Sequence, residues 1–85
     1  MDLPDELDVA EEAIDRVQRA LIERALWALP AEQRVAIALM DLGGFTAAEV
    51  ATMTGSPRGT VLARVHRGRK ALAHLVSEEV RRHAP

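Results

Sequence analysis

The sequence predicts an all-α fold, a compact domain of four to five helices. Three observations support this class. The apolar residues are mainly alanine, leucine and valine, with only Trp27 and Phe45 aromatic, which favours packed helices over a β-sheet. Apolar positions recur every three or four residues. Glycines and prolines punctuate this pattern at short intervals. Because 85 residues suffice for one modest core, we expect a single domain over residues 1–85 with its core at about 9–76.

The first helix is predicted from about Val9 to Leu29. Asp8 followed by Glu11 has the character of a capping box at its start. Pro30 ends it, because the residue before a proline avoids the α conformation. Apolar residues recur along this helix at Ile14, Val17, Leu21 and Ala25.

A second helix is expected to open at Pro30 or Ala31, with Glu32 in its first turn. Residues 35–40 are apolar on all sides, as expected for a helix that several neighbours bury. The pair Gly43-Gly44 ends it. We interpret Trp27, just before this helix, as a core residue, with an exposed anchor for a partner as the alternative.

A third, short helix is predicted over about residues 47–54. Thr46 and Glu49 form a capping box at its start, and Gly55 breaks it. Ser56 as N-cap and Pro57 at the first helical position begin a fourth helix, which can continue through Val76 before it frays at residues 81–83.

The third and fourth helices form a helix-turn-helix pattern. Ala51 must be small because the fourth helix crosses close to it. Gly55 supplies a turn conformation that is costly for other residues. Val50 and Val61 are expected to hold the two helices together.

The fourth helix has one apolar and one basic side. Val61, Val65, Gly68 and Leu72 form a stripe toward the core. At 100° per residue, the opposite face carries Gly59, Ala63, His66, Arg67 and Lys70. Thr60 and Arg64 flank that face on one side, and Arg58, Leu62 and Arg69 on the other.

Charge is distributed unevenly along the chain. Residues 1–33 carry nine acidic and three basic side chains, whereas residues 34–85 carry four acidic and eight basic ones. Residues 58–70 include five basic residues and no acidic one, which indicates a polyanion site. A basic helix face of this kind fits the DNA major groove. The structural alternatives are an ion pair of Arg64 with Glu49 or Asp41, and simple solvation of Arg67.

Several segments together resemble region 4 of bacterial sigma factors, most closely the extracytoplasmic-function group. These segments are Leu29-Pro30, Arg34, the run from Gly44 to Ala51, and the pattern from Gly59 to Leu72 that includes Arg64, Arg67 and Arg69. The resemblance covers roughly residues 20 to 76. It implies a domain whose last helix reads the −35 promoter element and whose other surface docks on the β flap of RNA polymerase, with Trp27 as an alternative anchor there.

The resemblance also implies roles for individual residues. Ala63, His66 and Arg67 would face the bases, while Thr60, Arg64 and the helix start at Thr46 would hold the DNA backbone. Arg58 and Lys70 belong to the basic face of the fourth helix, so we expect them to contact DNA as well. One departure is that the family usually has a basic or polar residue at Leu62 and a serine at Ala63, although alanine can still contact a thymine methyl. The expected DNA-binding set is therefore Thr46, Arg58, Thr60, Ala63, Arg64, His66, Arg67 and Lys70.

Other functions have less support. A response-regulator effector domain shares part of the helix-turn-helix pattern, and a sigma-like decoy that binds an anti-sigma factor is compatible with the apolar Leu62. We expect no enzymatic activity, metal or cofactor, because the chain has no cysteine, no phosphate-binding glycine loop and no metal-type histidine pair. The acidic start lacks the basic region of a signal peptide, and no apolar run approaches about 20 residues, so we expect a cytoplasmic protein.

Overall fold

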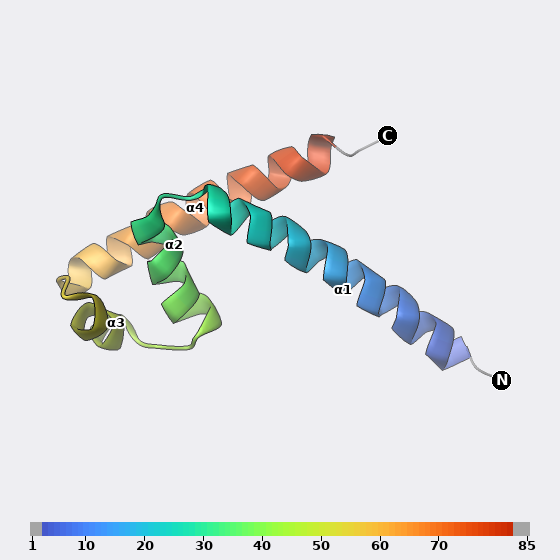
Figure 1. The fold of residues 1–85 in the computed structure, drawn as a ribbon, viewed down its shortest axis with the longest axis horizontal. Helices are drawn as coiled ribbons and strands as arrows, with labels where there is room; N and C mark the ends of the chain where they lie inside the picture. Colours follow the sequence, from blue (N-terminus) through green and yellow to red (C-terminus); the bar gives the residue numbers. More distant parts are fainter. Residues whose placement is uncertain (1–2, 83–85) are drawn as a thin grey trace.

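The structure is a computed structural model that describes residues 3–82, with side chains from residue 11 onward. All regular structure in this part is helical, which confirms the predicted fold class. The helix α4 is the scaffold, because α1, α2 and α3 all contact it (Figure 1). The elements are α1 (Leu3–Ala28), α2 (Ala31–Ile37), a π-helical segment η1 (Ala38–Leu42), α3 (Ala47–Thr54) and α4 (Arg58–Arg82).

Helix α1 begins earlier than the sequence predicted. It starts at Leu3 rather than near Val9, so Asp8 and Glu11 lie inside the helix and do not cap it. Proline is tolerated in the first helical turn, and acidic residues there suit the helix dipole, which explains why Pro4 does not prevent the earlier start. The predicted end before Pro30 is confirmed.

Arg34 fixes the corner between α1 and α2. Its Nη1 atom donates to the carbonyls of Leu29 at 3.0 Å and Trp27 at 3.3 Å, which are among the free carbonyls at the end of α1. The guanidinium also lies 4.7 Å from the centre of the Trp27 ring. Trp27 itself is 69% exposed, so its interpretation as a core residue was wrong.

The second helix is less buried than its composition indicated. Only Ala36 and Ile37 are buried, whereas Val35 is 44% exposed, because α4 covers one side of α2 and the other side faces solvent. The helix widens into η1, where the Gly43 N–H donates to the Ala38 carbonyl at 2.8 Å. Gly44 follows with a φ of 76°, which confirms the predicted glycine stop.

The core lies where α2 and α3 meet the first half of α4. Val50, Val61 and Ala47 form its centre, and Ala51 packs half-buried at the edge. Helices α2 and α4 cross closely at Gly68: a Cβ there would lie 2.5 Å from Cδ1 of Ile37. Gly68 therefore allows α2 and α4 to approach each other.

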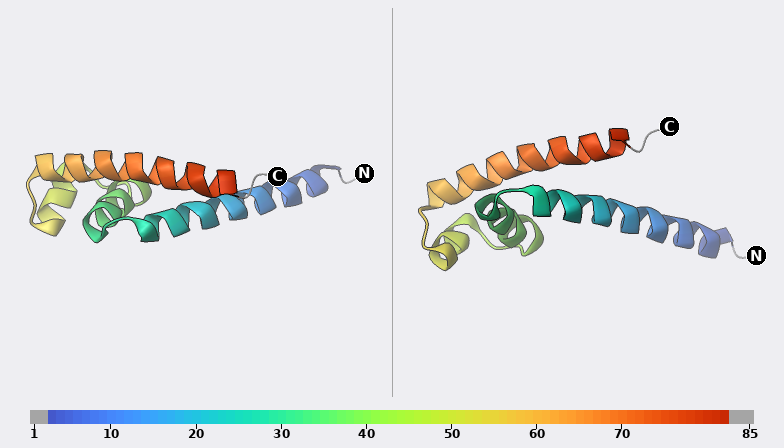
Figure 2. Two further views of the ribbon diagram at one scale, coloured as in Figure 1. Left: turned by 90° about the horizontal axis from the view of Figure 1, so that it is seen from above. Right: turned by 45° about the horizontal axis from the view of Figure 1, so that its top comes forward.

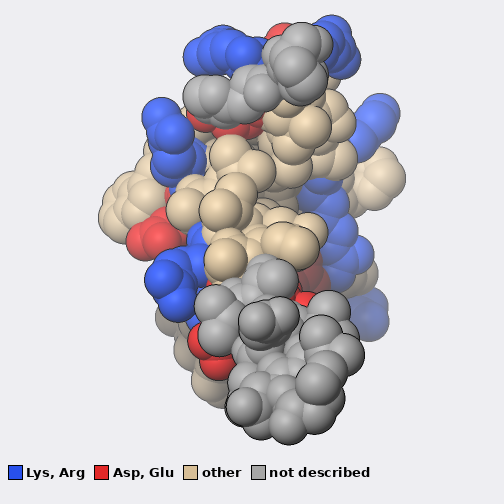
Figure 3. All heavy atoms as spheres, turned by 90° about the vertical axis from the view of Figure 1, so that its right-hand side faces the viewer, with Lys and Arg blue, Asp and Glu red and all other residues tan. Residues whose placement is uncertain are grey.

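The molecule is elongated, with extents of 55 × 30 × 14 Å. Helices α1 and α4 pack together near the α1–α2 corner and diverge toward the two termini (Figure 2). Seen from the end where the two termini lie, uncharged atoms occupy the middle of the surface, and lysine and arginine side chains lie on both sides with acidic side chains among them (Figure 3). No helix within residues 3–82 is long and apolar enough to cross a membrane.

Candidate nucleic-acid interface

Local sequence signals build the turn that presents α4. The Glu49 N–H donates to the Thr46 hydroxyl at 3.1 Å, and the Thr46 N–H donates to the Glu49 carboxylate at 2.9 Å. These two contacts confirm the predicted capping box, and the Thr46 amide lowers the pKa of the Glu49 carboxyl. Gly55 ends α3 in the left-handed conformation, with a φ of 69°.

The fourth helix begins one residue later than predicted. The Pro57 carbonyl accepts from the Val61 N–H at 3.1 Å, so Pro57 occupies the cap position and Arg58 is the first helical residue. Ser56 was expected to cap the helix. Its hydroxyl instead accepts a hydrogen bond of 3.0 Å from Nη1 of Arg64.

The structure divides the expected DNA-binding residues into two groups. Thr60, Ala63 and Arg64 are half-buried, because they lie on the side of α4 that approaches the start of α2. The remaining five, Thr46, Arg58, His66, Arg67 and Lys70, are exposed.

A cleft of about 360 Å³ separates that side of α4 from the start of α2, and Arg67 stands at its border with Thr60 and Ala63. Gln33 also lines this cleft. Its side-chain oxygen is buried and has no hydrogen-bond partner within the described part of the chain, so it can accept from a group that enters the cleft. Sequence reasoning missed Gln33, because a glutamine in an amphipathic helix gives no signal of its own.

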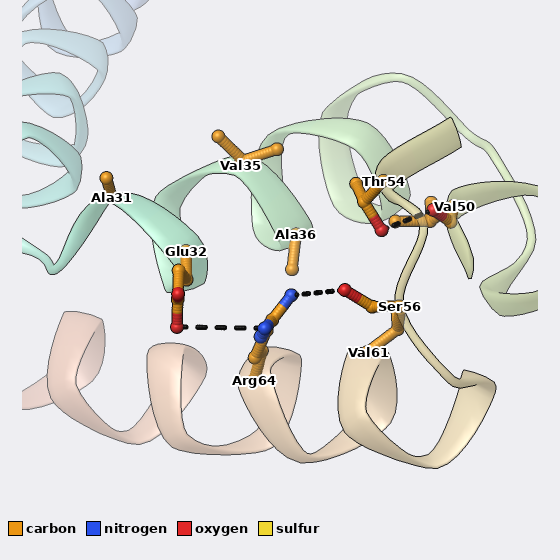
Figure 4. Close-up of a pocket in the computed structure, with 9 residues that line it drawn as sticks. All are labelled: Ala31, Glu32, Val35, Ala36, Val50, Thr54, Ser56, Val61 and Arg64. Atoms are coloured by element: carbon orange, nitrogen blue, oxygen red, sulfur yellow. Dashed lines mark hydrogen bonds and ion pairs between the residues drawn. The ribbon is translucent and has the colours of Figure 1, made fainter. Parts of the chain in front are cut away.

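Arg64 connects α4 to both neighbouring elements. Besides its bond to Ser56, its Nη2 atom lies 3.7 Å from the Glu32 carboxylate, and its side chain is only 23% exposed (Figure 4). The predicted alternative, a pair of Arg64 with Glu49 or Asp41, was wrong. Glu49 is engaged in the capping box, and Asp41 binds a different arginine.

That arginine is Arg69, on the other flank of α4. Its guanidinium binds the Asp41 carboxylate through two hydrogen bonds, Nε to Oδ2 at 2.9 Å and Nη2 to Oδ1 at 2.5 Å. The hydrogen bonding from Arg69 lowers the pKa of Asp41. The two flanks of the basic face are thus tied to the protein, and Arg67 between them has no ion pair within residues 11–82.

A second cleft lies on the other side of α2, between it and the helix-turn-helix (Figure 4). It measures about 360 Å³ and is mainly apolar, with Arg64 lying between Glu32 and Ser56. The apolar and small residues that line the rest are Ala31, Val35, Ala36, Val50, Thr54, Ser56 and Val61.

Comparison with known proteins matches these features to one family. The model of the family described as "Sigma-70, region 4" matches residues 19–72, which include α2, α3 and the basic half of α4. The chain belongs to the sigma-70 region 4 family. This membership confirms the resemblance inferred from the sequence and favours it over a response-regulator effector domain.

Curated relatives carry the same family name. The chain is 38% identical over 74 residues to the ECF RNA polymerase sigma factor SigM of Mycobacterium tuberculosis, an alignment that covers 87% of this chain and 38% of that protein. It is 34% identical over 79 residues to the ECF RNA polymerase sigma-E factors of Escherichia coli and Salmonella typhimurium, which covers 93% of this chain and 39% of theirs. This region 4 chain therefore spans less than half the length of these sigma factors.

Proposed function

We propose that the chain is the sequence-specific DNA-binding domain of a sigma factor, which recognises the −35 promoter element and docks on RNA polymerase. One observation carries the DNA-binding part: the exposed side of α4 presents His66, Arg67 and Lys70, while the protein itself holds the flanking Arg64 and Arg69. The function is one of binding, and we assign no catalytic step to the chain. Its place would be the cytoplasm, where bacterial promoters lie.

Within this proposal, the residues divide between bases and backbone. Ala63, His66 and Arg67 face base edges in the major groove. A second set of side chains positions the helix on the phosphates and sugars. This set comprises Thr46, Arg58, Thr60, Arg64 and Lys70. Arg64 can contribute in place, since its bond to Ser56 fixes the guanidinium beside the start of α4.

The decisive experiment compares Arg67→Ala with Arg81→Ala. Both remove one exposed arginine from α4, but Arg81 lies in its last turn, far from the helix-turn-helix. Because an arginine paired with a guanine edge discriminates by about 1–3 kcal/mol, Arg67→Ala should weaken the preferred duplex and relax selectivity at adjacent positions. Competition binding against single-base-substituted duplexes measures both the affinity for the preferred duplex and the selectivity at each position. If Arg67→Ala weakens every duplex by the same factor, Arg67 only contacts phosphate.

The proposal also predicts the salt dependence of binding. Phosphate contacts release counterions, so affinity should fall steeply as salt rises. Lys70→Ala should weaken all duplexes about equally and reduce the slope of log K against log salt by about one. Binding titrations at several salt concentrations test this. A flat salt dependence would exclude a phosphate-contacting role for this face.

For polymerase docking we propose the apolar cleft between α2 and the helix-turn-helix. Val35 lines it and is 44% exposed, so Val35→Asp should weaken capture of the domain by a β-flap fragment while leaving DNA affinity unchanged. Leu42→Asp is a matched control, because Leu42 is 69% exposed and is not among the residues that line the cleft. Equal effects of the two substitutions would place the docking surface elsewhere.

A decoy that binds an anti-sigma factor is the second candidate. The observation that favours it is Leu62, which is 39% exposed on α4 at a position where the family usually has a basic or polar residue. A decoy would bind DNA without sequence preference. The Arg67→Ala competition experiment distinguishes it from a promoter reader.

A further inference from the structure

Residues 11–20 of α1 form an amphipathic segment whose apolar side is uncovered. Residues 11–20 are all exposed, including Ile14 at 56% and Val17 at 60%. Toward the end of the helix the same side is covered, where Leu21 and Ala25 line a small cavity together with Leu75 of α4. Helices in proteins obtain most of their stability from packing of the apolar face, so an uncovered stripe continuous with an existing interface indicates a missing partner.

The sequence of α1 identifies the kind of partner. Its apolar residues follow a seven-residue repeat with alternating spacings of three and four, which is the pattern of a coiled coil. The repeat extends over most of the helix, well beyond the part that α4 covers (Figure 1). Its positions in the sequence are Leu3, Leu7, Ala10, Ile14, Val17 and Leu21.

We propose that α1 pairs with α1 of a second copy of this chain, in antiparallel orientation, with Ile14 of each copy opposite Val17 of the other. In this arrangement each α1 enters the angle between α1 and α4 of its partner, where the two helices diverge (Figure 2). The surface at this end of the molecule is uncharged in its middle and has basic side chains on both sides, with acidic side chains among them (Figure 3). An apolar helix with acidic flanks fits such a surface.

The distribution of charge favours a second copy and sets the orientation. Residues 2–15 carry seven acidic side chains and no basic one, whereas residues 16–28 carry three basic and one acidic. Parallel pairing would place the two acidic halves side by side. Antiparallel pairing places each acidic half beside the partner's basic half and near the last turn of α4, which ends in Arg81 and Arg82. Antiparallel helix dipoles also attract.

The dimer would leave the helix-turn-helix accessible. The helix α3 and the start of α4 lie at the opposite end of the long axis from the first turns of α1 (Figure 1). Two copies joined through α1 therefore carry their recognition helices at opposite ends of the assembly. With Ile14 opposite Val17, residues 11–20 of the two copies face each other, so the interface is small, and we expect a dissociation constant in the range of about 1–100 µM.

Sedimentation equilibrium of the full chain tests the pairing. We expect a monomer–dimer equilibrium, and Val17→Glu should raise its dissociation constant at least about tenfold, because each dimer loses two buried valines and gains two carboxylates. Ile22→Glu is the matched control, since Ile22 is an exposed apolar residue of α1 outside the stripe and is 40% exposed. Circular dichroism checks that both variants stay helical. A wild-type chain that is monomeric at about 1 mM, or equal effects of both variants, would overturn the proposal.

Disulfide trapping tests the orientation. The chain has no cysteine, so single-cysteine variants report only the designed contact. A mixture of Ile14→Cys and Val17→Cys chains should form mainly the mixed disulfide under mild oxidation. Predominance of the two homodisulfides would contradict the antiparallel register. A monomer that binds promoter DNA would overturn only the dimer, whereas a dimer without sequence preference would overturn only the proposed function.

Discussion

Helices α1 and α4 are almost equal in length, with 26 and 25 residues, but their surroundings differ. Three helices contact α4, which buries Val61, Val65 and Gly68 and has an arginine tied to a neighbouring element on each flank. Within residues 11–28 of α1, only the last two turns are covered. A helix with several neighbours has a fixed position and a defined role for each face, whereas the free part of α1 depends on local helix stability or on a partner.

The largest effect should come from the crossing of α2 and α4. Gly68→Leu should destabilise the domain by about 3 kcal/mol, because a Cβ at this position meets Ile37 and Gln33. Gly59→Leu is the control on the same helix, since no heavy atom lies within 4 Å of a Cβ there. Denaturant unfolding measures the free energy of unfolding of both variants. Equal stabilities of the two variants would mean that the crossing is looser than described.

A smaller effect is expected from the pair of Asp41 and Arg69. A double-mutant cycle with Asp41→Ala and Arg69→Ala should give a coupling energy of about 0.5–1 kcal/mol, because the pair is bidentate but partly exposed. The pKa of Asp41 is lowered in the folded state. The coupling should therefore be fully present above the unfolded-state pKa of about 3.9 and disappear as the pH falls through the folded-state pKa. A coupling that persists in strong acid would contradict this account.

The smallest effect concerns an ion pair between α1 and α4. Arg24 lies 3.3 Å from Glu79, but its side chain is 72% exposed. Arg24→Gln should change the free energy of unfolding by about 0.5 kcal/mol or less. Thermal melting at low and high salt measures this change. A loss as large as that of the Asp41 pair would show that α1 is held as firmly as α4.

Local signals predicted the helix-turn-helix well. The capping box at Thr46 and the glycine at Gly55 determine both ends of α3, because each acts on its own backbone neighbours. The same reasoning failed at Asp8 and Glu11, which resemble a capping box but lie within α1. A residue pattern cannot show that a helix already started one or two turns earlier.

Properties that depend on neighbours in space were harder to predict. The helical wheel placed Arg64 and Arg69 on opposite flanks of α4, as the structure has them, but it could not show which acidic residue each would meet. From the apolar character of Val35 and Trp27 we predicted that both lie in the core, yet both are exposed. Their burial depends on how many helices surround α2 and the end of α1, which periodicity does not encode.

The projecting α1 has a thermodynamic consequence. The radius of gyration is 16.3 Å, well above the value of about 12 Å for a compact globule of this length. Ile14 and Val17 keep 56% and 60% of their surface exposed in the folded monomer, so unfolding of this segment adds less hydration change than unfolding of a buried one. The heat-capacity increment of the monomer should therefore fall below the usual value of about 12–15 cal/mol/K per residue, which flattens its stability curve with temperature.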